Sequence, residues 1–305
     1  MTYDKQPVHN NIPSPLIREI YMNQLMRYAS DGIKKTWYKM PQGVRATWIM
    51  FAVTAVSLQW CLGGGGSNEK MVSSANVISD AKNSTINGKD LPIYCVDRQN
   101  DASKQVSLSF DAAWGADDTI RILDTLDKYN VKVTFFMTGG WVNDYPDMVK
   151  EIYARGHDLG NHSENHKQMS KLSEAQNQEE IMKVHDKVKE LTGYDMFLFR
   201  PPYGDYDSEL IKTVYGMNYY PIQWSIDSLD WKDYGVDSII KRVVESKYLD
   251  NGAIILCHNG AKYTAEALGS LIGGIQAKGY ELVPISQLII RDDFHMDTTG
   301  KQIAD

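Results

Sequence analysis

The sequence predicts an α/β domain built on a parallel β-sheet, preceded by a membrane-spanning segment and a flexible tether. Three observations support this. Short apolar runs alternate with longer amphipathic stretches about seven times between residues 91 and 290. A run without any charged side chain occupies residues 46–62. A stretch rich in Gly, Ser and Asn then fills residues 63–90, which is typical of a linker.

Composition limits the classes of function. The chain has 305 residues, and 43% of them are hydrophobic, which is typical of a globular protein with a sizeable core. The formal net charge is -7, so the chain lacks the basic field that binds a phosphate backbone. We therefore expect no nucleic-acid partner.

The apolar run at 46–62 is predicted to be a single transmembrane helix. The 45 residues before it carry seven Lys and Arg side chains, and this excess predicts that segment 1–45 is cytoplasmic. A cleaved signal peptide would have a shorter positive region and a site with small residues, so we favour an uncleaved span. The domain at 91–305 is therefore expected on the external face of the cell membrane.

Within that domain the strands and helices follow from hydrophobic periodicity. The predicted strands are 106–110, 133–137, 157–159, 197–199, 219–226, 253–257 and 281–283. The predicted helices include 119–129, 173–191, 208–217, 238–248 and 265–278. This alternation indicates a parallel sheet that is either open or closed into a barrel.

Unusual polar residues follow the apolar runs, at the expected carboxyl ends of the strands. They are Asp111, the pair His162 and His166, Arg200, the pair Asp227 and Asp230, and His258. In a parallel β/α barrel these ends converge on one face, where active sites are built. Each residue alone also has a structural explanation, such as a helix cap or a solvated charge. Their shared position argues for one site.

The chemistry of these residue types is narrow. His162 and His166 lie four apart, one helical turn, so both imidazoles can face one divalent metal and leave a position for water. Asp111 is the candidate base for that water, and His258 the candidate acid for an amine leaving group. An arginine beside the base would keep it ionised, and a carboxylate beside the acid would raise its pKa and keep it protonated. Arg200 and Asp230 fit these two roles.

Five motifs in this order resemble the polysaccharide deacetylases of carbohydrate esterase family four, over about residues 105–290. The motifs are Ser109-Phe110-Asp111, His162-Ser163-x-x-His166, Arg200-Pro201-Pro202-Tyr203, Asp227-Ser228-Leu229-Asp230-Trp231 and Leu256-Cys257-His258. The resemblance implies a distorted (β/α)7 barrel and metal-dependent removal of N-acetyl groups from hexosamine polymers. The implied metal is zinc, with cobalt or manganese as alternatives.

The resemblance also implies roles for individual residues. Asp111 would be the general base, paired with Arg200. His258 would be the general acid, paired with Asp230. His162 and His166 would be metal ligands.

Four further residues would contact the substrate by the same resemblance. Tyr203 would lend a backbone N–H to the oxyanion. Trp231 and Leu256 would wall the acetate pocket, and Pro202 would lie beside the substrate.

One departure from the family pattern concerns the metal. Ala112 stands where most members have an aspartate ligand, in the sequence FDAAWGADDT. We expect Asp118 to replace that ligand after a turn at Gly115, with Asp117 as the second candidate. Alternatively, both aspartates cap the helix beginning near Thr119, and water completes the metal shell.

The sequence thus predicts a membrane-tethered, metal-dependent N-deacetylase of a cell-wall glycan, most simply peptidoglycan. One alternative is a deacetylase of chitin-like oligosaccharides or an exopolysaccharide. Another is a wall-binding module that has lost catalysis, for which Ala112 is the supporting feature.

Overall fold

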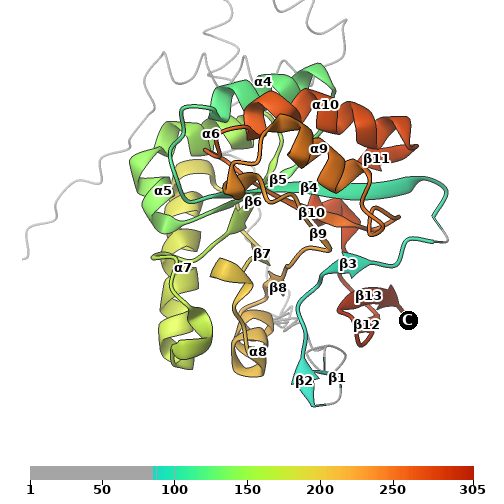
Figure 1. The fold of residues 1–305 in the computed structure, drawn as a ribbon. Helices are drawn as coiled ribbons and strands as arrows, with labels where there is room; N and C mark the ends of the chain where they lie inside the picture. Colours follow the sequence, from blue (N-terminus) through green and yellow to red (C-terminus); the bar gives the residue numbers. More distant parts are fainter. Residues whose placement is uncertain (1–84, 87, 100) are drawn as a thin grey trace, which may run out of the picture. The chain divides into compact units, whose positions relative to one another are not determined.

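The computed structural model describes residues 85–305 except 87 and 100 (Figure 1). The described residues lie within one compact unit. The predicted transmembrane segment 46–62 lies outside the described residues. Within the described part of the chain, no helix is both long and apolar enough to cross a membrane.

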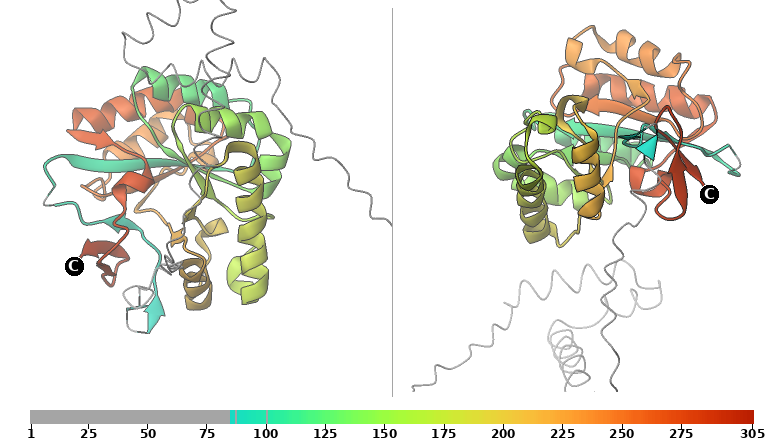
Figure 2. Two further views of the ribbon diagram at one scale, coloured as in Figure 1. Left: turned by 180° about the vertical axis from the view of Figure 1, so that it is seen from behind. Right: turned by 90° about the horizontal axis from the view of Figure 1, so that it is seen from below.

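A curved parallel sheet forms the centre of the domain (Figures 1 and 2). Its strands run in the order β8-β7-β6-β5-β4-β10-β9, and β11 pairs with β4 beside this path. All of these ladders are parallel. The bounds are β4 (Lys104–Ala112), β5 (Thr134–Met137), β6 (Asp158–Asn161), β7 (Leu198–Phe199), β8 (Tyr220–Pro221), β9 (Ile226–Asp227), β10 (Ile254–His258) and β11 (Tyr280–Leu282).

Helices pack around this sheet (Figures 1 and 2). They are α4 (Thr119–Lys128), α5 (Gly139–Asp144), α6 (Pro146–Ala154), α7 (Glu174–Thr192), α8 (Ser208–Gly216), α9 (Val236–Val244), α10 (Thr264–Ala277) and α11 (Ile285–Leu288). The longest, α7, begins at a capping box in which Ser173 and Gln176 satisfy each other's backbone N–H, and it ends at Gly193 with φ 74°. The path runs from β8 to β9 without a ladder that joins these two strands, so the architecture is a half-barrel rather than a closed ring.

The central strand β4 explains how the sequence places a polar site inside a hydrophobic fold. Successive side chains of a strand point to opposite faces. Val106, Leu108, Phe110 and Ala112 belong to the hydrophobic cluster that includes the buried faces of the surrounding helices. The intervening residues Ser107, Ser109 and Asp111 are buried polar side chains. The alternation in VSLSFDA therefore directs Asp111 away from the helical layer.

A smaller three-stranded sheet, β12-β13-β3, lies beside the half-barrel. Its strands are β3 (Cys95–Val96), β12 (Phe294–Met296) and β13 (Lys301–Ala304). A hairpin of β1 (Thr85–Ile86) and β2 (Lys89–Asp90) precedes it. The backbone N–H of Asp90 donates to the Ser208 hydroxyl at the start of α8, 3.0 Å away. Residues 85–90 of segment 63–90, which the sequence assigned wholly to a linker, thus contain regular structure.

One local prediction is corrected. The single strand predicted at 219–226 is two strands, β8 paired with β7 and β9 paired with β10. Pro221 at the end of β8 has no N–H to continue a ladder, which fits the break. Helices α5 and α6 fill the segment between β5 and β6, in keeping with the predicted alternation of strands and helices, although no bounds were predicted for them.

A buried histidine outside the site makes the stability of this fold pH-dependent. His157 is 3% exposed, and its Nδ1 accepts the N–H of Val133 at 3.2 Å. Burial lowers its pKa from 6.5 to about 4. In the unfolded chain His157 takes up a proton below about pH 6.5, whereas in the native chain it stays neutral until the pH approaches 4. The free energy of unfolding is therefore highest above pH 6.5 and falls as the pH drops towards 4.

We therefore expect His157 to cost about 2 kcal/mol of unfolding free energy between pH 7 and pH 5. In His157→Asn an amide oxygen can still accept from Val133 but nothing titrates. Urea unfolding at both pH values should show a smaller drop for this variant. An equal drop in both proteins would contradict the assignment.

Candidate active site

Asp111 ends β4 with its carboxylate held by an arginine. Arg200 Nη1 donates to Asp111 Oδ1 at 2.7 Å, and His162 Nε2 lies 3.5 Å from the other oxygen, Oδ2. Burial acts to raise the pKa of Asp111, but the charges of Arg200, His162 and His258 and the arginine hydrogen bond outweigh it and leave the pKa lowered. Asp111 is thus an ionised carboxylate with one oxygen directed at the histidine.

Arg200, at the end of β7, is a fully buried guanidinium with 0% exposure. Its Nη2 donates to Ser109 Oγ at 2.9 Å and to the Gln223 carbonyl oxygen at 3.3 Å. The Phe136 ring packs on it, with its centroid 4.1 Å from Cζ. Because a buried unpaired charge is costly, this environment fixes Arg200 against Asp111.

His162 and His166 meet through their ring nitrogens. Their Nε2 atoms are 3.2 Å apart, and His162 Nδ1 lies 2.7 Å from the Arg200 carbonyl oxygen. That carbonyl can only accept, so Nδ1 carries the proton and Nε2 of His162 carries the lone pair. Burial lowers the pKa of both rings, that of His162 to about 4, and both are therefore neutral at pH 7.

The pair is not on a helix, contrary to the geometry that the four-residue spacing suggested. It lies in a loop after β6 in which Ser163 and His166 have φ values of 63° and 52°. The Ser163 N–H donates to Asn161 Oδ1, and the His166 N–H donates to Ser163 Oγ, both at 3.0 Å. These local bonds hold two left-handed residues, and the resulting turn brings the rings together.

Two neutral imidazoles with converging Nε2 atoms fit a divalent cation, and the carbonyl bond behind His162 is the usual support for such a ligand. This pair offers two ring nitrogens that could bind such a cation. No group of three or more His, Cys, Asp or Glu side chains gathers around one metal position among residues 85–305, leaving aside 87 and 100. The two histidines therefore fit as donors to a divalent cation, with Asp111 Oδ2 3.5 Å from His162 Nε2 beside them.

His258, the last residue of β10, is held by a buried carboxylate. It stands in register with Asp111 on the neighbouring strand β4. Its Nδ1 lies 2.7 Å from Asp230 Oδ1, and its backbone N–H donates to Asp230 Oδ2 at 2.7 Å. Burial acts to lower the pKa of His258, but the hydrogen bond and charge of Asp230 outweigh it and raise the pKa. A carboxylate with a lowered pKa and an imidazole with a raised pKa thus end neighbouring strands.

Asp118 is not brought to the histidine pair. Both of its carboxylate oxygens accept the backbone N–H of Gly260, at 3.0 and 3.1 Å. It occupies the N-cap position of α4, yet its side chain makes no capping bond. Among the described residues, the Asp118 carboxylate thus belongs to no group of three or more potential metal ligands, and it does not cap the helix. Asp117, the second candidate, is exposed.

The four predicted substrate residues have different environments, and Tyr203 contacts His166. Tyr203 has φ 62° and an exposed ring whose centroid is 4.5 Å from that of His166. Trp231, in the short helix η4 (Asp230–Lys232), is exposed, with Lys232 Nζ 4.1 Å from its ring centroid. Leu256 and Pro202 are buried.

The sequence reasoning missed several polar residues that support the site. Thr264 Oγ1 donates to Asp230 Oδ2 at 2.6 Å. Glu180 of α7 accepts the backbone N–H and the side-chain N–H of Asn165, each at 2.8 Å, and so holds the histidine loop. In the sequence these are a threonine and a glutamate on helices, where such residues are common, and only their burial distinguishes them.

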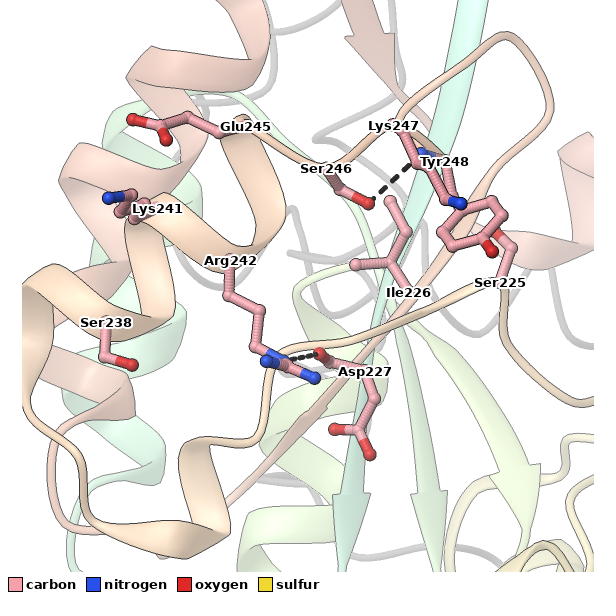
Figure 3. Close-up of a pocket in the computed structure, with 10 residues that line it drawn as sticks. All are labelled: Ser225, Ile226, Asp227, Ser238, Lys241, Arg242, Glu245, Ser246, Lys247 and Tyr248. Carbon is pink, nitrogen blue, oxygen red and sulfur yellow. Dashed lines mark hydrogen bonds between the residues drawn. The ribbon is translucent and has the colours of Figure 1, made fainter.

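A cavity of about 580 Å³ lies between β9 and α9 (Figure 3). Arg242 Nε donates to the Asp227 carbonyl oxygen at 3.0 Å, and the Asp227 carboxylate points away from the arginine (Figure 3). The acid, the base and the histidine pair are absent from its lining. This cavity is therefore separate from the candidate centre.

Comparison with known proteins agrees with this geometry. The family model for polysaccharide deacetylases matches residues 98–222. A peptidoglycan-N-acetylglucosamine deacetylase of Bacillus cereus is 32% identical over 188 residues, which are 60% of this chain and 68% of that protein. The chain belongs to the polysaccharide deacetylase family.

Other members of the polysaccharide deacetylase family are similar. Peptidoglycan-N-acetylglucosamine deacetylase PgdA of Listeria monocytogenes is 36% identical over 186 residues, 61% of this chain but only 39% of its own length. The crystal structure of BA3943 from Bacillus anthracis, a family-four pseudoenzyme, has a TM-score of 0.61 and 31% identity and covers 69% of both chains. These matches confirm the α/β half-barrel, and they include members with and without catalysis.

Proposed function

We propose that this chain removes acetyl groups from N-acetylated hexosamine residues of a cell-wall glycan, most simply peptidoglycan. The observation that carries the proposal is the pairing of Asp111 with Arg200 and of His258 with Asp230 at adjacent strand ends, beside two neutral histidines. The relatives named as peptidoglycan deacetylases support the substrate class.

Each residue then has a defined task. Asp111, kept ionised by Arg200, takes a proton from the attacking water through Oδ2. His258, kept protonated by Asp230, delivers a proton to the departing amine nitrogen. The backbone N–H of Tyr203 is proposed as the donor to the oxyanion.

His162 and His166 would hold the divalent cation, with zinc as the expected metal and cobalt or manganese as alternatives. A bound cation there supplies a Lewis acid that lowers the pKa of water and polarises the acetyl carbonyl. Trp231, Leu256 and Pro202 are proposed to border the acetyl group.

The proposed role of His258 as the acid predicts how kcat depends on pH. His258 must be protonated to donate, so kcat should fall as the pH rises through its raised pKa. Asp230→Asn removes the charge that raises this pKa, and the alkaline limb of the kcat–pH profile should move to lower pH. The profile is measured on soluble N-acetylglucosamine oligomers, and an unmoved limb would contradict the pairing.

We also propose that the domain acts outside the cell, tethered by residues 46–62 and the segment that follows. This rests on the charge asymmetry of the sequence. Protease treatment of intact cells should then degrade the domain while a cytoplasmic marker survives.

Two alternatives remain testable by substrate. Acetate release from soluble oligomers with none from purified peptidoglycan would assign the chain to chitin-like or exopolysaccharide substrates. A wall-binding module is favoured by the pseudoenzyme relative and by Ala112. Glycan binding without acetate release in zinc, cobalt or manganese would select that module.

A further inference from the structure

The loop between β4 and α4 and the loop after β10 approach each other closely. Gly260 has φ +84°, a conformation that favours glycine. A Cβ on it would lie 3.1 Å from the Gly115 carbonyl oxygen and 3.3 Å from Trp114 Cβ. The contact therefore leaves little room for a side chain at position 260, and the two loops pack backbone against backbone.

Hydrogen bonds lock this contact. Asn259 is 0% exposed, and its Nδ2 donates to the Gly115 carbonyl oxygen at 2.9 Å. Thr119 Oγ1 donates to Asn259 Oδ1 at 3.0 Å. The Gly260 N–H donates to both oxygens of Asp118. Both polar ends of the Asn259 side chain are thus used between the loops, next to His258.

Trp114, from the first loop, lies on the imidazole of His258. The ring centroids are 5.2 Å apart and the planes are 20° from parallel, so the rings stack. Asp230 fixes the imidazole in its own plane through Nδ1, and Trp114 covers one of its faces. An indole at this distance also attracts an imidazolium through its π face. Trp114 itself is 48% exposed.

We propose that the segment Ala112–Thr119 is a clamp that positions His258, in which Trp114 and Asp118 are positioning residues and Asn259 is the link between the loops. This rests on the proposed function, in which His258 is the acid. It assigns Asp118 to the acid rather than to the metal, and it gives the altered first motif FDAAWG a task of its own.

The clamp acts on proton delivery and not on substrate affinity, and this separates it from a sugar-binding role for the exposed Trp114 ring. Misplacing a reacting group by about 1 Å can lower the rate by about 100-fold. Trp114→Leu and Asp118→Ala should therefore lower kcat by about 10- to 100-fold on soluble N-acetylglucosamine oligomers, with KM changed by less than about threefold.

Conservative variants are the matched controls. Trp114→Phe keeps an aromatic face, and Asp118→Asn keeps an oxygen that accepts the Gly260 N–H, so both should recover most of kcat. Zinc content should be the same in all four variants and in the wild type. A raised KM with unchanged kcat in Trp114→Leu would overturn the clamp in favour of a sugar platform. Loss of zinc in Asp118→Asn would overturn it in favour of a metal ligand.

A spectroscopic measurement on the full-length chain tests the clamp even if the enzyme has no activity. A stacked indole shifts the His258 ring-proton resonances upfield. In histidine-labelled protein this shift should be present in the wild type and in Asp118→Asn, and reduced in Asp118→Ala. An identical shift in Asp118→Ala would show that Asp118 does not position the stack. Inactive wild-type protein with the expected shifts would overturn the proposed function but not the clamp geometry.

Discussion

Asp111→Asn is expected to lower kcat by about 10²- to 10⁴-fold, the range for loss of a general base. The amide keeps an oxygen that can accept from Arg200 Nη1, now 2.7 Å from Oδ1, but it cannot take a proton. The effect should appear in kcat rather than KM, because the proton moves only in the transition state. Initial rates of acetate release on soluble oligomers measure both constants.

A matched control is Asp147→Asn. Asp147 also pairs with a cation, Lys150 at 3.2 Å, but both side chains are on the surface. Its activity should stay within about twofold of the wild type, since exposed ion pairs contribute little. Asp111→Asn with wild-type kcat would remove Asp111 from the role of base.

Arg200→Met is expected to lower the free energy of unfolding by about 3 to 5 kcal/mol. The guanidinium is 0% exposed, and its removal leaves the Asp111 carboxylate buried without its cationic partner. Ser109 Oγ and the Gln223 carbonyl oxygen also lose a donor. Urea unfolding at pH 7 provides the measurement.

Two further variants separate charge pairing from loss of volume. Arg155→Met removes an arginine that is 20% exposed and pairs with the more exposed Asp124, Asp127 and Glu151, and it should cost about 1 kcal/mol. The double variant Asp111→Asn/Arg200→Met contains no buried charge at the pair. Its loss of unfolding free energy should therefore be smaller than the sum of the losses in the two single variants. Additive losses would show that the pair is not coupled.

Much of the site could be predicted from sequence because strand ends converge in a parallel sheet. Asp111 and His258 each follow an apolar run, and the structure places them in register on β4 and β10. Arg200 and Asp230 were predicted as their partners from charge and from the family resemblance, and both contacts are formed at 2.7 Å. Residue type, topology and the family motifs together predicted these four.

Loop geometry could not be predicted in the same way. The spacing of His162 and His166 suggested a helical turn, whereas the structure uses left-handed residues at Ser163 and His166. The Asp118 carboxylate accepts a hydrogen bond from Gly260, which lies 142 residues later in the chain and comes close to Asp118 only in the folded protein. Spacing along the chain carries no information about such long-range contacts, because it describes only neighbours in sequence.

The supporting roles of Asn259, Thr264 and Glu180 could not be predicted from the sequence for a related reason. These residue types are usually exposed, and nothing in the local pattern marks them as buried. Each is buried and bonded to a residue of the site or its loops. Their role follows from the hydrogen bonds that burial obliges them to make.

The most direct test of the central claim is acetate release from purified peptidoglycan by metal-stripped protein titrated with zinc, with wild type and the variant His162→Ala/His166→Ala compared in parallel. The account predicts that the wild type gains activity as it takes up zinc, and that the double variant neither binds zinc at this affinity nor releases acetate. Wild-type protein that binds zinc and peptidoglycan but releases no acetate, from either peptidoglycan or soluble oligomers, would contradict it.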